Sequence, residues 1–180
     1  MLPSRLIRVA TFPDREPYFG SNGKNRFDAP GCPGTPEYSA CYFGTSLAVA
    51  IAETVLHDEV PRTGKFYIAA ETLDDKQVLY FKGRRLRLAD MTGAQLKRLG
   101  GTADLAGTAD YAVTQAWALA VYVNPGNFDG FVYMSRHFNT NKAVVLFDRA
   151  EKKIALKSFA KLGIAEGFAE AAELFGIIAI

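Results

Sequence analysis

Residues 42 to 53 constrain the fold of this chain more than any other stretch. They read Tyr-Phe-Gly-Thr-Ser-Leu-Ala-Val-Ala-Ile-Ala-Glu. The aromatic start is typical of the end of a strand, and a hydroxyl of Thr45 or Ser46 can cap the first free amides of a helix. Apolar residues then recur every third or fourth position and cover most of the helix circumference. The pattern predicts a strand followed by a largely buried helix that ends near Asp58.

Glu53 is the only charged residue of this predicted helix before Asp58. A carboxylate among apolar neighbours must be paired, protonated or available to a ligand. From the residues alone, a structural ion pair with an arginine and a functional site are both open interpretations. Glu53 is therefore the first candidate for a site residue.

The remaining pattern predicts one α+β domain over residues 1 to 180, a length that suits a single core. Strands are expected at residues 5–11, 38–43, 65–70, 77–81, 85–89, from 131, 143–147 and 154–159. Further helices are expected from Asp90 to Gly100, at 109–122 and at 164–175. The apolar end, 177–180, should pack as a strand or in a subunit interface.

Residues 13 to 38 hold four glycines and five prolines and show no periodicity. A loop of this length in a compact domain is usually functional or mobile. Arg26 lies in its middle, within the run Asn-Arg-Phe-Asp. An arginine presented by such a loop can clamp a phosphate through two parallel hydrogen bonds. The alternatives are an ion pair with Asp28 or a merely exposed side chain.

A second candidate region follows the turn at 125–130. If the strand that begins at residue 131 continues to 137, Tyr133, Ser135 and His137 point to one face and Arg136 to the other. A Ser-His hydrolase is disfavoured, because neighbours two apart on a strand seldom reach hydrogen-bond geometry and no GxSxG motif is present.

Several classes of function are disfavoured by composition. A net charge of +2 argues against a nucleic-acid binder, and the basic run 82–87 suits a solvated hairpin or, alternatively, a contact surface for an acidic partner. Neither a membrane-spanning run nor a signal peptide is visible, so a cytoplasmic protein with two reduced cysteines is expected. His57 follows Glu53 by one helical turn, but without a third ligand in view no metal site is expected.

Three motifs, taken in order, resemble the RES domain family. They are Asn-Arg-Phe-Asp at 25–28, Tyr-Phe-x-x-Ser-x-x-x-Ala-x-x-Glu at 42–53, and Asp-Gly-Phe-Val-Tyr-x-Ser-Arg at 129–136. The family is named after an Arg, a Glu and a Ser, which match Arg26, Glu53 and Ser135 here. The resemblance covers about residues 5 to 148.

The resemblance implies an ADP-ribosyltransferase-like fold with a mixed or antiparallel sheet, and a bacterial toxin that degrades NAD without a metal. Its partner would be an Xre-type, helix-turn-helix antitoxin, and a homodimer is a further expectation. Glu53 would stabilise the positively charged ribose. Arg26 would hold the pyrophosphate, Tyr42 would stack on the nicotinamide or face its ribose, and Ser135 and Arg136 would bind a ribose hydroxyl or phosphate.

The acceptor of the ADP-ribosyl group stays open at this point. Inorganic phosphate would make the protein an NAD phosphorylase, and water would make it an NAD glycohydrolase. A protein side chain would make it a protein mono-ADP-ribosyltransferase. A catalytically inactive NAD-binding or interaction module is the alternative from a different class, although retention of Arg26, Tyr42, Glu53 and Ser135 together speaks against it.

Overall fold

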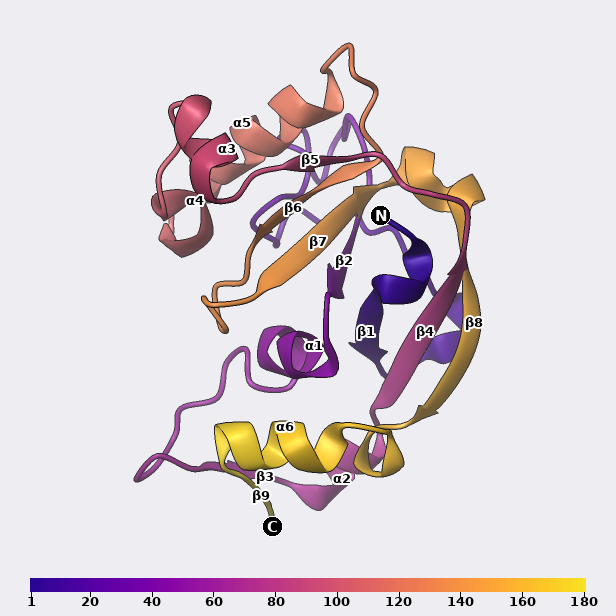
Figure 1. Cartoon of the computed structure of the whole chain (residues 1–180), viewed down its shortest axis with the longest axis vertical. Helices are drawn as coiled ribbons and strands as arrows, with labels where there is room; N and C mark the ends of the chain where they lie inside the picture. The colour runs from indigo at the N-terminus through magenta and orange to yellow at the C-terminus, as the bar shows by residue number, and fades with distance from the viewer.

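The computed structural model describes all residues from 1 to 180, and a seven-stranded sheet runs through its length (Figure 1). The strand order is β5-β6-β7-β2-β1-β4-β8, with β5 and β6 parallel and every other pair antiparallel. The strands of this sheet are β1 (Ile7–Ala10), β2 (Ala40–Gly44), β4 (Gln77–Gly83), β5 (Leu88–Asp90), β6 (Gly130–Met134), β7 (Lys142–Phe147) and β8 (Ile154–Lys161). The predicted α+β fold with a mixed sheet is confirmed.

The helices are mostly short. They are α1 (Leu47–Thr54), α2 (Ala70–Asp74), α3 (Gly93–Arg98), α4 (Asp104–Gly107), α5 (Tyr111–Tyr122) and α6 (Phe168–Phe175). Single turns of 3-10 helix lie at Pro3–Arg5, Pro13–Arg15 and Leu162–Ile164, and a longer one lies at Asp148–Lys153. None of the helices has the length and apolarity needed to cross a membrane.

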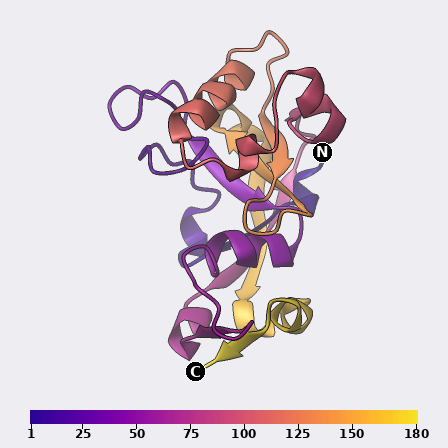
Figure 2. The same cartoon turned by 90° about the vertical axis from the view of Figure 1, so that its left-hand side faces the viewer.

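One face of the sheet carries two separate apolar clusters. The first packs α5 and the N-terminal loop against β6 and β7, with Phe27 and Phe131 at its centre. The second packs α1 and α6 against β1 and β4, with Val9 and Val78 among its members. Figure 2 shows α5, α1 and α6 one below another along this face. The face is therefore divided, and the C-terminal half of α1, with Ala50, Glu53 and Thr54, lies at the divide.

The opposite face of the sheet is covered by a third cluster. It includes Leu79, Phe81 and Val144, whose neighbours along their strands belong to the first face. This alternation is what a sheet buried on both sides requires, because successive side chains point to opposite faces. The sheet thus forms a rigid floor beneath the divide between the first two clusters.

Helix α1 begins as the sequence predicts. The Ser46 hydroxyl accepts a hydrogen bond from the Val49 amide at 3.3 Å, which makes Ser46 the N-cap. A Cβ atom on Gly44 would lie 2.7 Å from the Ala50 nitrogen, so only glycine lets the helix turn back this closely over β2. The helix ends at Thr54 and not near Asp58, because the amides of Val55 and Leu56 both donate to the Ile51 carbonyl and close the helical pattern.

Other element boundaries differ from the prediction where short helices replace extended or irregular chain. The strand expected at 65–70 is β3 (Phe66–Ile68), after which α2 begins at once. Helix α4 lies between the helices expected to end at Gly100 and to begin at residue 109, where no helix or strand was expected. Asp90 ends β5 and does not cap α3; its carboxylate accepts from the amide and hydroxyl of Thr92, which precedes the helix. Helix α6 begins at Phe168, since a 3-10 turn and Gly167 precede it.

The apolar C-terminal segment forms a strand, as one of the two predicted alternatives stated. Strand β9 (Ile177–Ala179) pairs in parallel with β3 in a separate two-stranded sheet, with Phe66 opposite Ile177. Helix α6 lies between this small sheet and α1 and contacts both. Residues beyond 161 therefore support the helix that carries Glu53.

Candidate active site

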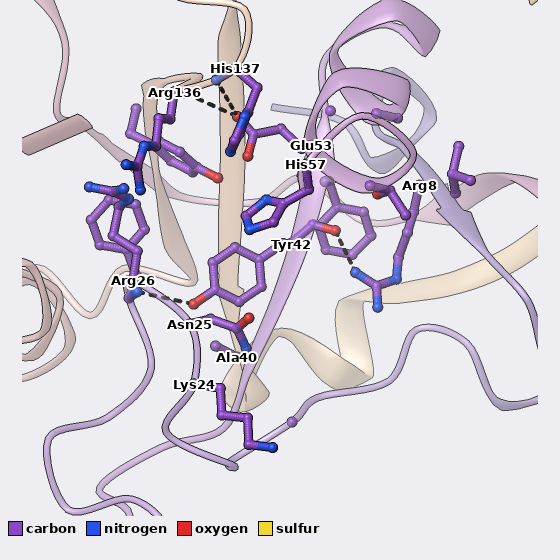
Figure 3. A pocket seen from close by; sticks show the side chains of 18 of the residues that line it. Arg8, Lys24, Asn25, Arg26, Ala40, Tyr42, Glu53, His57, Arg136 and His137 are labelled. Atoms are coloured by element: carbon purple, nitrogen blue, oxygen red, sulfur yellow. Dashed lines mark hydrogen bonds between the residues drawn. The ribbon is translucent and has the colours of Figure 1, made fainter. Parts of the chain in front are cut away.

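A cleft of about 310 Å³ opens at the divide between the two apolar clusters (Figure 3). Its floor is β2, one wall is α1, and the opposite wall is the N-terminal loop around Arg26. The cationic side chains that line it are Arg8, Lys24, Arg26 and Arg136, and the only acidic one is Glu53. A surface with this balance of charge favours an anionic ligand.

The N-terminal loop is irregular, as predicted, but it is tightly anchored beside the cleft. Phe27 is buried in the first apolar cluster, 1% exposed. The Thr114 hydroxyl of α5 donates to the Arg26 carbonyl at 2.6 Å. The Arg26 guanidinium donates to the Thr108 carbonyl at 2.8 Å and lies over the Tyr111 ring. The Asn-Arg-Phe-Asp run therefore folds so that the phenylalanine anchors it and the arginine enters the cleft.

Arg26 has no carboxylate partner. The ion pair with Asp28, left open by the sequence, does not form, because the Asp28 carboxylate accepts hydrogen bonds from Asn25 and from the Tyr42 hydroxyl. Burial and the neighbouring Arg136 guanidinium lower the pKa of Arg26, because two positive charges lie close together where little water can screen them. Arginine remains charged under these conditions, so an anion placed between the two groups would be strongly favoured.

Glu53 is held by neutral donors and forms no ion pair with an arginine. Its Oε1 atom accepts from the Ser135 hydroxyl at 2.5 Å, from the Arg136 amide at 3.0 Å and from the His137 amide at 3.5 Å. All three donors come from the turn after β6. The Oε2 atom takes part in none of these bonds, and the carboxylate lies in the cleft wall (Figure 3). The alternative interpretation of Glu53, a structural ion pair with an arginine, is therefore wrong.

The turn after β6 overturns one sequence prediction. Strand β6 ends at Met134, and the Ser135 amide donates to the Asn141 carbonyl, so the chain turns at this point. The strand alternation therefore fails, and the Arg136 and His137 side chains both line the cleft. Arg136 does not point to the opposite face, as a continued strand would require.

Ser135 is fully buried and does not line the cleft. Its hydroxyl donates to Glu53 and accepts from the Phe138 amide at 2.9 Å. Both contacts belong to the protein, so in this arrangement the serine fixes the Glu53 carboxylate in place. It does not form the disfavoured Ser-His pair with His137.

Tyr42 forms the middle of the cleft floor. Its hydroxyl accepts from the Phe27 amide at 3.1 Å and donates to the Asp28 carboxylate at 2.9 Å. Burial, together with the Asp28 charge, raises the pKa of Tyr42 well above its usual value, which keeps the phenol protonated. The Arg8 guanidinium donates to the Tyr42 carbonyl at 2.9 Å and pairs with Glu16. Tyr42 thus joins the floor of the cleft to the loop that carries Arg26.

Two histidines complete the wall next to Glu53, and sequence reasoning recognised only one of them as a neighbour. The His57 and His137 rings lie 4.5 Å apart between centroids. One ligand atom from each ring and one from Glu53 lie within 4.8 Å of one another. Burial lowers the pKa of His137, although the Glu53 charge opposes this effect. His137 reaches this position because of the turn at Ser135, which no residue pattern indicates.

The mixed sheet and the cationic cleft with one fixed carboxylate define a small α+β domain whose cleft has the charge to suit an anionic ligand. Residues 5–161 match the model of the RES domain, and the chain belongs to the RES domain family. This confirms the resemblance noted in the sequence.

The fold also resembles a solved structure. A chain in the crystal structure of the M. tuberculosis MbcT-MbcA toxin-antitoxin complex aligns with a TM-score of 0.61 and 14% sequence identity, over 94% of this chain and 87% of that chain. At this identity the likeness extends to the fold alone. Among curated protein sequences, none gave a significant match.

Proposed function

We propose that this protein is the toxin of a toxin-antitoxin system and that it cleaves the bond between nicotinamide and ribose in NAD. Membership of the RES domain family supports this proposal, and the structural neighbour comes from a toxin-antitoxin complex. The observation that carries it is the geometry of Glu53. Its Oε1 atom is fixed by three hydrogen bonds while its carboxylate faces a cleft that also holds three arginines and one lysine.

The pyrophosphate of NAD suits the cationic part of the cleft. Arg26 and Arg136 carry two guanidinium groups without carboxylate partners, and each can donate parallel hydrogen bonds to phosphate oxygens. Binding of a dianion would relieve the repulsion between these two cations. A bound pyrophosphate would therefore also stabilise the positions of Arg26 and Arg136.

Glu53 would act on the other half of the ligand. Departure of nicotinamide leaves a ribose with oxocarbenium character, and a carboxylate aimed at this charge stabilises it. The leaving ring loses its own positive charge when the bond breaks, so no general acid is needed. Tyr42 would offer its ring to the nicotinamide or its ribose, while Ser135 would keep the Glu53 carboxylate correctly oriented.

We infer that the cleft is also where an antitoxin acts. A helix-turn-helix antitoxin of the Xre type would inhibit by inserting a segment that carries a carboxylate against Arg26 or Arg136, which would occupy the pyrophosphate position. A complex in which the cleft remained open would contradict this inference.

Proton NMR of purified protein with NAD, in buffers with and without inorganic phosphate, tests the proposed reaction. Release of nicotinamide that accelerates with phosphate and yields ADP-ribose-1″-phosphate identifies a phosphorylase, whereas phosphate-independent release of ADP-ribose identifies a glycohydrolase. If ADP-ribose appears only on protein in a lysate with labelled NAD, the alternative protein ADP-ribosyltransferase is favoured. NAD that stays intact in every arm would refute the proposal.

Glu53→Gln is the matched variant, because glutamine keeps an oxygen that can accept the bonds from Ser135 and Arg136 while removing the charge. Turnover should fall by about 10²-fold to 10³-fold, as is usual when one preorganised electrostatic stabiliser is lost. Glu71→Gln is the control, since Glu71 is exposed on α2, away from the cleft. Unchanged turnover in the Glu53 variant would place the chemistry elsewhere.

A further inference from the structure

We propose that Glu53, His57 and His137 form a binding site for a transition-metal ion such as Zn²⁺, and that the bound ion blocks the cleft. The ligand atoms of these three residues lie within 4.8 Å of one another. The Nε2 atom of His137 is buried and has no hydrogen-bond partner in the protein. An unpartnered imidazole nitrogen beside a carboxylate and a second imidazole is an arrangement that suits metal coordination.

The donor types select the ion. Two imidazoles and a carboxylate with an open fourth position are a common zinc set, and imidazole also suits Co²⁺, Ni²⁺ and Cu²⁺. Mg²⁺ and Ca²⁺ prefer oxygen ligands and are disfavoured. With metal-ligand bonds of about 2.0 to 2.2 Å, tetrahedral ligands stand about 3.3 to 3.6 Å apart. Because the ligand atoms lie within 4.8 Å of one another, the site must contract by at most about 1.5 Å at its widest pair.

His57 can supply this contraction. It follows the end of α1 and its side chain is 45% exposed, so its ring can rotate without disturbing the core. Asp58 Oδ1 lies 3.7 Å from His57 Nε2, beyond hydrogen-bond distance, so the His57 ring is not held by this carboxylate and can turn toward the ion. Glu53 is already fixed through Oε1, which leaves Oε2 as its ligand atom.

Two charges oppose the ion. Arg26 and Arg136 line the same cleft and both repel a cation near His137. Three protein ligands in such surroundings make a site that fills when free metal rises, not a permanently loaded structural site. This distinguishes the proposed ion from a cofactor, and the proposed cleavage of NAD does not use it.

The inhibitory consequence rests on the proposed function, whereas metal binding itself does not. An ion on Glu53 Oε2 neutralises the carboxylate that would face the ribose and occupies the space next to it. Zn²⁺ and NAD should then compete, so that each raises the other's apparent dissociation constant. Reversible inhibition by a metal ion would act on the enzyme independently of any antitoxin.

The test uses the full chain with Cys32→Ser as background, because a half-exposed thiol could bind metal on its own. Isothermal titration with Zn²⁺ should give one ion per chain, Co²⁺ should give the visible absorption of a four-coordinate ion, and Mg²⁺ should give neither. His57→Gln should weaken Zn²⁺ binding by about 10-fold to 100-fold or more. His137→Gln should do the same, with His57→Gln as the safer variant because its side chain is exposed.

Nicotinamide release measured in parallel separates the two proposals. Zn²⁺ should inhibit the parent protein, and His57→Gln, compared with its own metal-free rate, should lose the inhibition. Equal Zn²⁺ affinity in the parent and His57→Gln would overturn the site, as would failure of both Zn²⁺ and Co²⁺ to bind. Zn²⁺ binding that depends on His57 in a protein that never cleaves NAD would support the metal site and refute only the proposed function. Inhibition that persists in His57→Gln would overturn the proposed blocking mechanism.

Discussion

The Ser135 hydroxyl donates a 2.5 Å hydrogen bond to Oε1 of Glu53 across 82 residues of sequence. This bond joins the turn after β6 to α1, two elements from different parts of the chain. It also explains why a buried serine that cannot touch a ligand in the cleft belongs with the site. The serine acts on any ligand through the carboxylate that it positions.

Replacing Ser135 by alanine should therefore reduce turnover more than NAD affinity. The variant leaves Glu53 one donor short and the Phe138 amide without its acceptor, which should cost about 1 to 3 kcal/mol of stability. Nicotinamide release should fall by about 10-fold to 100-fold in kcat, with a smaller change in KM. Ser158→Ala, on the exposed part of β8, is the control. Equal kcat for Ser135→Ala and wild type would argue against a positioning role.

Arg26 should contribute to NAD affinity through the two parallel hydrogen bonds of its guanidinium and not only through its charge. Arg26→Gln should raise KM for NAD by about 10-fold to 100-fold, and Arg26→Lys should recover only part of this loss because an ammonium cannot donate two parallel bonds. Initial rates over a range of NAD concentrations measure both. Arg5→Gln, an exposed arginine outside the cleft, is the control. Full recovery by lysine would show that charge alone matters.

Tyr42→Phe should loosen the Arg26 loop. The lost hydroxyl satisfies the Phe27 amide and the buried Asp28 carboxylate, so the variant should lose about 1 to 3 kcal/mol of unfolding free energy. Urea unfolding measures this change, and KM for NAD should rise alongside it. Tyr80→Phe, whose hydroxyl has no hydrogen bond in the protein, should leave both quantities near wild type. A stable Tyr42→Phe with a raised KM would mean that the hydroxyl contacts the ligand directly.

The two cysteines should differ sharply in reactivity. Burial raises the pKa of Cys41 to about 12, against the opposing attraction of Arg8, while the half-exposed Cys32 has a smaller increase in pKa, also caused by burial. Iodoacetamide at pH 8 should modify Cys32 slowly and Cys41 only after unfolding in urea, which peptide mass spectrometry can follow. Rapid native modification of Cys41 would show that the core around β2 opens.

The same thiol predicts how stability changes at alkaline pH. Between the ordinary pKa of 9.0 and about 12, folded Cys41 keeps a proton that the unfolded chain releases. The unfolding free energy should therefore fall as pH rises through this window, and the stabilising contribution is fully present below pH 9. Urea unfolding at pH 8 and pH 10 measures the change, and Cys41→Ala should reduce it. The same slope in both proteins would rule out Cys41 as its source.

Much of the fold could be predicted because its determinants are local. The cap at Ser46, the apolar periodicity after it and the alternating strands identify β2, α1 and most of the large sheet. The short helices α2 and α4 could not be predicted, since helices of this length show too little periodicity to be distinguished from loop. The pairing of β9 with β3 could not be predicted either, because a short apolar run carries no information on which strand it pairs with.

The site divides in the same way. Arg26, Tyr42 and Glu53 could be singled out from their motifs, and all three line one cleft. The positions of Arg136 and His137 could not be predicted, because strand alternation holds only as far as Met134 and the turn beyond it depends on contacts with distant residues. The close approach of His137 to Glu53 and His57 was missed for this reason, although His57 was recognised.

The candidate site draws on both halves of the chain. Arg26 and Glu53 come before the exposed stretch that ends at Gly100, whereas Arg136 and Ser135, which holds Glu53, come after it. A polypeptide divided at Gly100 would leave each half with an incomplete site. Under the proposed function, two such halves would be harmless apart and would kill a cell only when fused partners bring them together. Death of the bacteria would then report that the two fused partners bind each other, and survival that they do not. The hydrogen bond between Ser135 and Glu53 would form only when the two halves assemble.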